Sequence, residues 1–251
     1  MQVVILAGGL GTRLSEETDV IPKPMVRIGN LPILHHIMNY YAGFGHTDFV
    51  IALGYKAEFI KDYFADINEI NWNISLVDTG LETATGGRIK RLESLLDDEF
   101  MLTYGDGLSN IDLDKLIEHH KKYNKIATVT AVRPPARFGA IQINAGIVTK
   151  FAEKDPQDQG WINGGFFCLN KKICSFIQDS QTSFEGEPLN SLVAIRELTA
   201  FEHFGWWQPM DTLREKRVLE SMWQAGEAPW LNSSHDSAPT RKGWLPAQGK
   251  N

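Results

Sequence analysis

Apolar residues along the chain follow two alternating patterns, and each pattern predicts a different kind of element. The run VVIL at 3–6 is apolar throughout, as in a strand that is buried on both faces of a sheet. In the segment 33–41, apolar residues occupy positions 33, 34, 37, 38 and 41, which is the spacing of an amphipathic helix. The two patterns predict strands at 3–6, 48–53, 74–77, 100–104, 127–132 and 162–169, and helices at 33–41, 57–64, 87–96, 112–123 and 212–224.

Strands that alternate with helices indicate an α/β fold, with a mostly parallel sheet flanked by helices on both faces. The pattern changes after residue 132, where the segment AIQINAGIVTKF places two short strands around Asn144-Ala145-Gly146 and predicts a hairpin within 141–151. We therefore expect one domain over 1–231, made of a part at 1–132 and a small β-rich part at 133–231. The polar stretch 232–251 has no periodicity, and it is predicted to be a disordered tail.

Composition narrows the classes of partner and compartment. The 251 residues carry a net charge of −6, so a large nucleic-acid footprint is not expected. The two cysteines, Cys168 and Cys174, suit a reducing, cytoplasmic location better than a disulfide framework or a zinc site. No stretch reaches the roughly 20 apolar residues of a membrane-spanning helix, so no membrane partner is expected.

Glycines follow the first predicted strand directly. In AGGLGTR, Gly8, Gly9 and Gly11 permit close approach of backbone amides to an anion, and Arg13 adds a forked cation. The loop is neither a Walker loop, which needs Gly-Lys-Ser/Thr, nor a dinucleotide fingerprint, because Leu14 stands where glycine or alanine is required. It therefore predicts a phosphate site of another kind, and the alternative is a tight turn without a ligand.

Lys23 lies between Pro22 and Pro24, which restrict its backbone. A lysine held in this way loses less conformational freedom when it meets a ligand, although a solvated lysine on a rigid turn has the same pattern. Two carboxylates are candidates for binding Mg²⁺, which prefers one or two such groups together with phosphate oxygens. Asp106 follows the strand at 100–104, and Asp211 precedes the helix at 212–224; a turn aspartate and a helix N-cap are the alternatives.

These segments together resemble the sugar-1-phosphate nucleotidyltransferases. The matching pieces, over roughly 1–230, are LAGGLGTRL, PKP, YGDG at 104–107, EK at 153–154, NGGFF at 163–167 and QPMDT at 208–212. These motifs are most similar to those of family members that join CTP to glucose 1-phosphate. The resemblance implies a Rossmann-like fold, a CDP-sugar product for surface-polysaccharide or deoxysugar synthesis, pyrophosphate release and a homo-oligomer. It assigns 1–132 to the nucleotide and 133–231 to the sugar phosphate.

The resemblance also implies roles for individual residues. Arg13, Lys23 and Asp106 would be catalytic, and Asp106 and Asp211 would hold Mg²⁺. Glu153, Lys154, Asn163, Gly164 and Trp207 would bind the sugar phosphate. The predicted nucleotide-binding residues are Leu6, Ala7, Gly8, Gly9, Gly11, Thr12, Arg13, Lys23, Thr85, Gly86, Arg88 and Gly105.

Three questions stay open at the level of sequence. Arg88 can donate to N3 or O2 of cytosine, which favours CTP over UTP or dTTP, but it can also begin a helix and face solvent. Gly164 and Gly165 interrupt a strand, which indicates either close approach of a sugar or a β-bulge. The connection at 65–71 is shorter than in typical glucose-1-phosphate enzymes, which leaves another phosphorylated acceptor open; a non-catalytic nucleotide-binding subunit is the alternative of a different class.

Overall fold

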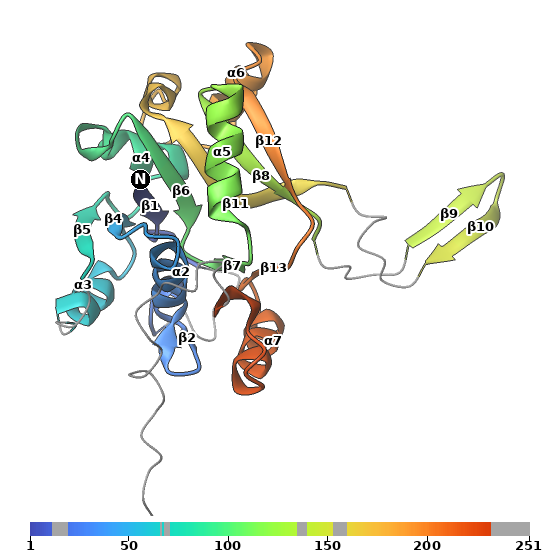
Figure 1. Cartoon of the computed structure of the whole chain (residues 1–251), viewed down its shortest axis with the longest axis horizontal. Coiled ribbons are helices and arrows are strands. Elements are labelled where there is room, and N and C mark those ends of the chain that lie inside the picture. Colours follow the sequence, from blue (N-terminus) through green and yellow to red (C-terminus); the bar gives the residue numbers. More distant parts are fainter. Residues whose placement is uncertain (12–19, 66, 68–70, 135–139, 153–159, 232–251) are drawn as a thin grey trace, which may run out of the picture.

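The computed structural model describes residues 1–11, 20–65, 67, 71–134, 140–152 and 160–231. A seven-stranded sheet forms its centre (Figure 1), in the order β12-β8-β11-β6-β1-β4-β5. Neighbouring strands are parallel, except that β11 runs antiparallel to both β6 and β8. The strands are β1 (Gln2–Leu6), β4 (Asp48–Leu53), β5 (Asn73–Asp78), β6 (Glu99–Tyr104), β8 (Ala127–Val132), β11 (Ile162–Asn170) and β12 (Leu198–His203).

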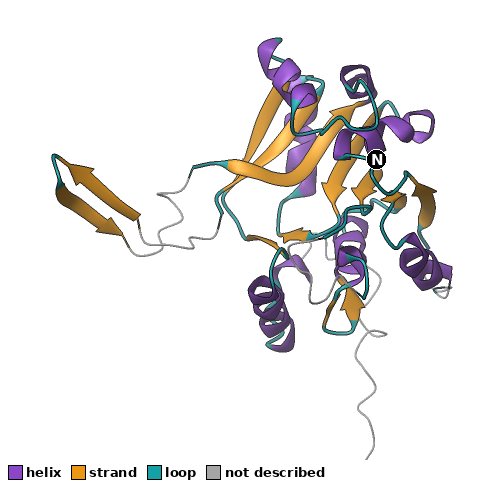
Figure 2. Cartoon of the chain, turned by 180° about the vertical axis from the view of Figure 1, so that it is seen from behind, coloured by secondary structure: helices purple, strands orange, loops and turns teal. Residues whose placement is uncertain are grey.

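Helices cover both faces of this sheet (Figure 2). Alternate residues of β1 point to opposite faces: Val3 and Ile5 belong to one apolar cluster, whereas Val4 and Leu6 belong to the other. The first cluster includes residues of α2 (Ile33–Ala42), α3 (Ala57–Ala65), α5 (Leu113–Tyr123) and α7 (Leu213–Gln224). The second includes residues of α4 (Thr85–Arg91), the 3₁₀ helix η5 (Lys171–Phe176) and α6 (Glu187–Ala194).

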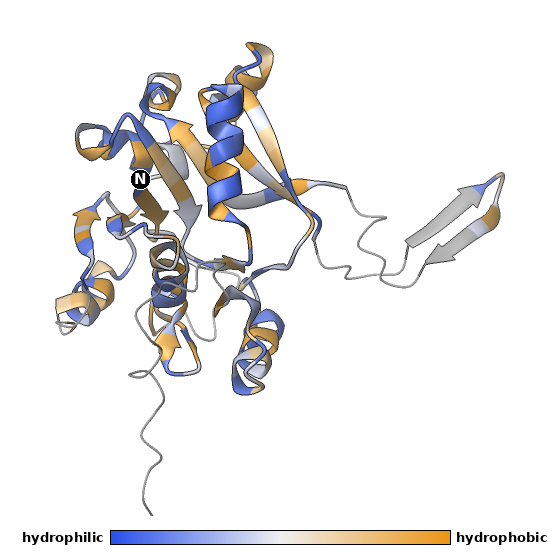
Figure 3. Cartoon of the chain, in the orientation of Figure 1, coloured by the Kyte–Doolittle hydropathy of each residue, from blue (hydrophilic) through white to orange (hydrophobic). Residues whose placement is uncertain are grey.

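Burial of β1 explains why its sequence has no polar position after Gln2. Val3, Val4 and Ile5 each have 0% of their surface exposed, and full burial of one such side chain is worth about 1.5–3 kcal/mol. Figure 3 shows the contrast with α5, which turns a largely hydrophilic surface outward. The predicted α/β fold, a mostly parallel sheet flanked by helices, is confirmed, with β11 as an antiparallel strand inside the sheet.

Short elements connect the main ones. They are the 3₁₀ helices η2 (Lys23–Met25), η3 (Glu93–Leu95) and η6 (Pro229–Leu231), and the paired strands β2 (Arg27–Ile28) with β3 (Leu31–Pro32) and β7 (Gly107–Ser109) with β13 (Trp207–Pro209). The helix η3 lies beside the start of β1, whereas η2, β7 and β13 lie beyond the carboxyl end of β6. No helix within the described ranges is long and apolar enough to cross a membrane.

Some elements differ from the sequence prediction. The helix expected at 87–96 is α4 followed by η3, so it begins earlier and breaks at Leu92. The patterns did not predict α6 or β12. Only Pro188 and Leu192 are buried in α6, and β12 (LTAFEH) has no fully buried residue, so neither carries a strong apolar period.

The predicted hairpin is present as β9 (Ala140–Asn144) and β10 (Ile147–Ala152), which form a sheet of their own (Figure 1). Its turn contains Ala145 and Gly146, both with positive φ. The central sheet itself continues across residue 132, because β11 and β12 are the two neighbours of β8. The predicted tail at 232–251 and residues 66 and 68–70 of the short connection lie outside the described residues.

Candidate active site

A pocket of about 640 Å³ opens where the chain changes direction across the sheet. From β1 the chain passes to β4 and β5 on one side and then returns to β6 on the other, so the loops after β1 and β6 diverge. Ligands of open α/β sheets bind in such crevices. Predicted site residues that line the pocket are Leu6, Ala7, Gly8, Gly9, Gly11, Lys23, Thr85, Arg88, Gly105, Asp106, Asn163, Gly164, Trp207 and Asp211.

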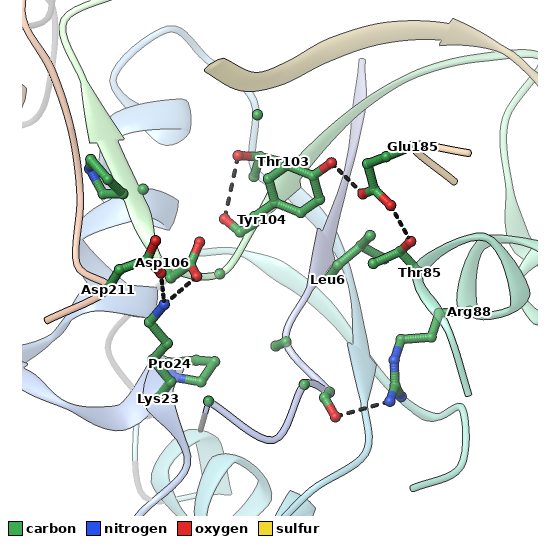
Figure 4. Close-up of a pocket in the computed structure, with 18 of the residues that line it drawn as sticks. Leu6, Lys23, Pro24, Thr85, Arg88, Thr103, Tyr104, Asp106, Glu185 and Asp211 are labelled. Carbon is green, nitrogen blue, oxygen red and sulfur yellow. Dashed lines mark hydrogen bonds and ion pairs between the residues drawn. The ribbon is translucent and has the colours of Figure 1, made fainter. Parts of the chain in front are cut away.

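Lys23 lies between the two predicted metal-binding carboxylates (Figure 4). Its Nζ is 2.6 Å from Asp106 Oδ2 and 2.6 Å from Asp211 Oδ1. Lys23 is buried at the start of η2, directly after extended Pro22. Burial acts to lower the pKa of Lys23, but Asp106 and Asp211 outweigh it, so the pKa is raised and the side chain is a cation.

Strand pairing brings the two aspartates together from distant parts of the chain. β7 pairs with β13, and Met210 N donates to Asp106 O at 2.9 Å. Asp211 also stands just before helix α7, whose capping box joins Thr212 and Glu215. Glu215 Oε2 accepts from the backbone amide of Asp211 at 2.8 Å. The cap therefore fixes the backbone that carries the second carboxylate; the N-cap itself is Thr212, not Asp211.

The donors at this point suit a hard divalent cation. Carboxylate oxygens from two different connections, β6–β7 and β13–α7, converge on one position, which Nζ of Lys23 occupies. Within the described part of the chain, no three His, Cys, Asp or Glu residues come together as a metal cage. A site with two carboxylates needs further ligands from water or substrate, as is usual for Mg²⁺ at phosphates.

The glycine loop after β1 combines two different requirements. A Cβ on Gly8 would collide with the guanidinium of Arg88, whereas a Cβ on Gly9 would meet nothing within 4 Å. Gly11 has φ +65°, a conformation that favours glycine. Gly8 is thus required by protein packing, and Gly9 leaves room at the pocket wall. Thr12 and Arg13, the other predicted residues of this loop, lie outside the described residues.

Arg88 is buried, with 3% of its surface exposed, so the alternative that it faces solvent is wrong. Its Nη2 donates to Gly8 O at 2.9 Å, which ties the glycine loop to α4. Further acceptors are Leu53 O, Thr79 Oγ1, Gly80 O and Leu81 O. Burial lowers the pKa of Arg88. The guanidinium thus connects the glycine loop, the end of β4 and the loop at 79–81, and direct contact with cytosine stays a prediction.

Replacing Arg88 by methionine is expected to lower the free energy of unfolding by about 2–4 kcal/mol, because several buried carbonyl oxygens lose their donor. Chemical denaturation measures the change. Arg91→Met is the matched control: Arg91 is an exposed arginine of the same helix that donates to Thr79 O, and its loss is expected to cost less than about 1 kcal/mol. Equal destabilisation by both variants would contradict the loop-holding role of Arg88.

Strand β11 forms another wall of the pocket, and its pairing with β8 is irregular at its glycines. Its register against β8 shifts between Asn163 and Phe167, as the bulge alternative for the two glycines predicts, and close approach of a sugar stays a prediction. Gly165 has φ +78°, and a Cβ there would lie 2.6 Å from the Tyr104 ring. Trp207 Nε1 donates to Gly164 O at 2.7 Å, and Asn163 lines the pocket beside Gly164. Three predicted acceptor-site residues, Asn163, Gly164 and Trp207, therefore form one wall. Glu153 and Lys154 lie outside the described residues.

Several pocket residues were not predicted from the sequence, among them Glu185 and Tyr104, and one predicted residue, Gly86, does not line the pocket. Glu185 and Tyr104 line the pocket and hydrogen-bond to each other at 2.5 Å. Tyr104 was within reach, because it stands directly before Gly105-Asp106, whereas Glu185 belongs to a segment without a motif. Gly86, predicted to bind the nucleotide, instead packs where a Cβ would lie 2.6 Å from Thr182 O.

The chain belongs to the nucleotidyl transferase family, whose model matches residues 2–208. It is similar to the glucose-1-phosphate cytidylyltransferase of Salmonella typhimurium, with 50% identity over 92% of this chain and 98% of the relative. It is also similar to the probable glucose-1-phosphate cytidylyltransferase of Bacillus subtilis, with 40% identity over 92% of this chain and 99% of the relative. Among solved structures, HddC from Yersinia pseudotuberculosis superposes with a TM-score of 0.71 at 28% identity, covering 88% of this chain and 99% of that one.

Proposed function

We propose that this protein joins CTP to α-D-glucose 1-phosphate and releases CDP-glucose and pyrophosphate. The observation that carries the proposal is the cluster of Lys23, Asp106 and Asp211 in the pocket between the loops after β1 and β6. The 50% identity to a glucose-1-phosphate cytidylyltransferase supports the choice of substrates. Surface-polysaccharide or deoxysugar synthesis is the use that such a product suggests.

The reaction needs positioning and charge neutralisation more than a covalent group from the protein. A phosphate oxygen of the sugar phosphate attacks the α-phosphorus of CTP in line, the new P–O bond forms, and the bond to the β-phosphate oxygen breaks. Nucleotidyltransferases of this family generally use a divalent metal ion. We propose that Asp106 and Asp211 hold Mg²⁺, which neutralises charge on the α-phosphate when bound.

Each pocket wall then has a part in binding. Lys23 Nζ, which lies between the two carboxylates, binds the α-phosphate, where negative charge develops. Backbone amides of Gly9 and Gly11 face the triphosphate, and Arg13 adds a cation to the leaving pyrophosphate. Asn163, Gly164 and Trp207 contact the acceptor together with Glu153 and Lys154. Arg88 shapes the nucleoside side of the pocket by holding Gly8 and the loop at 79–81.

One assay separates this proposal from its alternatives. Pyrophosphate release is measured with CTP, UTP, dTTP and GTP, each combined with a panel of phosphorylated sugars, with and without a chelator. The proposal predicts turnover with CTP and glucose 1-phosphate that the chelator abolishes and Mg²⁺ restores. Preference for another pair would change the substrates but keep the chemistry, whereas nucleotide binding without turnover would identify a regulatory subunit.

We further propose a cytoplasmic homo-oligomer. Cys168 and Cys174 are both free, and burial raises the pKa of Cys168 to about 12 and that of Cys174 to about 11, so both stay as inert thiols. The homo-oligomer follows from the family resemblance alone, since single exposed apolar residues such as Phe204 (76% exposed) and Ile147 (68% exposed) do not mark an interface. Light scattering coupled to size-exclusion chromatography measures the assembly.

A further inference from the structure

Glu185 collects hydroxyl groups at the end of the pocket away from Lys23 (Figure 4). Its Oε1 accepts from the Tyr104 hydroxyl at 2.5 Å, and its Oε2 accepts from Thr85 Oγ1 at 2.6 Å and from Ser183 Oγ at 2.8 Å. Tyr104 and Thr85 belong to strand β6 and helix α4, so one carboxylate connects two walls of the pocket.

The segment that carries Glu185 is fixed against α4. Ala84 N donates to Ser180 O at 2.9 Å, Gly87 N donates to Thr182 O at 3.2 Å, and Phe184 N donates to Thr85 Oγ1 at 2.9 Å. Phe184 is fully buried beneath this segment. Such anchoring holds the carboxylate in place before any substrate arrives, as an efficient binding residue requires.

The charge of Glu185 restricts what it can meet. Burial acts to raise the pKa of Glu185, but hydrogen bonds from Thr85, Tyr104 and Ser183 lower it overall, so the group is a carboxylate. A carboxylate repels phosphate and accepts strongly from hydroxyl donors. Its side chain is exposed to the open pocket. A hydroxyl-bearing part of a substrate, and not its phosphate, is the group that fits there.

Contacts of Tyr104 point to the acceptor and not to the nucleotide. Asn163 Nδ2 donates to the Tyr104 hydroxyl at 3.3 Å, and Asn163 Oδ1 accepts from Gly165 N at 2.8 Å. Glu185, Tyr104 and Asn163 thereby form one chain of hydrogen bonds that ends at the wall where Trp207 holds Gly164. This wall is the one to which the proposed function assigns the sugar phosphate.

We propose that Glu185 binds a hydroxyl group of the acceptor sugar and thereby selects the acceptor, with Tyr104 and Thr85 as the residues that position it. The inference rests on the proposed function, because the acceptor is taken to be a sugar 1-phosphate. Glu185 is thereby a specificity-determining residue of the acceptor site in addition to Glu153 and Lys154.

The test combines Glu185→Gln with deoxy forms of the acceptor. Steady-state kinetics and calorimetric binding are measured with glucose 1-phosphate and its 2-, 3-, 4- and 6-deoxy analogues. We expect Glu185→Gln to raise KM and Kd for glucose 1-phosphate about ten- to one-hundred-fold, with KM for CTP changed less than about threefold. The deoxy analogue that lacks the hydroxyl bound by Glu185 is expected to bind the wild type more weakly than glucose 1-phosphate does, by about the same factor as the variant loses. Glu185→Gln is expected to bind this analogue and glucose 1-phosphate equally well, because the residue and the hydroxyl act as a pair.

Two further variants keep the outcome interpretable. Glu187→Gln is the matched control, because Glu187 lies two residues away and hydrogen-bonds to Gln178; it is expected to leave all constants unchanged. Glu185→Asp keeps the charge, and its KM and Kd for glucose 1-phosphate are expected to lie between those of the wild type and those of Glu185→Gln. The assignment would be overturned if Glu185→Gln changed only KM for CTP. It would also be overturned if the variant and the wild type preferred glucose 1-phosphate over every deoxy analogue by the same factors. If the wild type binds no sugar 1-phosphate and shows no turnover, the proposed function fails instead.

Discussion

Asp106→Asn is expected to lower kcat by about three orders of magnitude, which corresponds to about 4 kcal/mol of transition-state stabilisation. Asparagine has the size of aspartate but lacks the negative charge that a divalent cation requires. The backbone bond from Met210 N to Asp106 O does not involve the side chain, so the β7–β13 pairing is retained. Pyrophosphate release at a series of Mg²⁺ concentrations measures both the loss of kcat and any shift in metal requirement.

Asp112→Asn is the control for the general effect of removing a carboxylate. Asp112 caps helix α5 by accepting from Lys115 N, and asparagine caps a helix about as well as aspartate. This variant is expected to keep wild-type turnover and stability. Near-normal kcat for Asp106→Asn, with the fold intact by circular dichroism, would remove Asp106 from the catalytic site.

Lys23→Met is expected to have two opposite effects. Turnover falls by about two to three orders of magnitude, because the α-phosphate loses its cation. Divalent-ion binding without nucleotide becomes tighter by about tenfold or more, because Nζ no longer competes for the two carboxylates. The Nζ distances of 2.6 Å to both Asp106 and Asp211 are the reason for the second effect.

Calorimetric titration with Mn²⁺ in the absence of CTP measures the second effect directly and does not depend on activity. Lys61→Met is the matched control, since Lys61 pairs with Glu58 on the surface; it is expected to change neither turnover nor metal binding. Unchanged Mn²⁺ affinity in Lys23→Met would show that lysine and metal occupy separate positions.

The strand pattern predicted the sheet well because buried strands have continuous apolar runs. It also placed Asp106 correctly, since a polar residue after such a run lies at the carboxyl edge, where ligands bind. The convergence of Lys23, Asp106 and Asp211 could not be predicted from spacing, because it depends on the antiparallel β7–β13 pairing of two three-residue strands.

Arg88 shows the opposite limit. The sequence correctly marked it as a pocket residue, but a single sequence cannot show that five oxygens from two loops and the end of β4 surround one guanidinium. Glu185 could not be found at all, because its neighbours Thr85 and Tyr104 are far away along the chain. Such residues become visible only when the fold brings their segments together.

The place of β11 in the sheet has a consequence for how the polypeptide assembles. β8 is made before both of its neighbours, since β11 and β12 follow it in the chain. On the ribosome, Ala127–Val132 therefore emerges with two open edges, and such edges are prone to pair with other chains. A fragment that stops at residue 132 would keep this strand unpaired, so the residues after 132 are needed to complete the sheet.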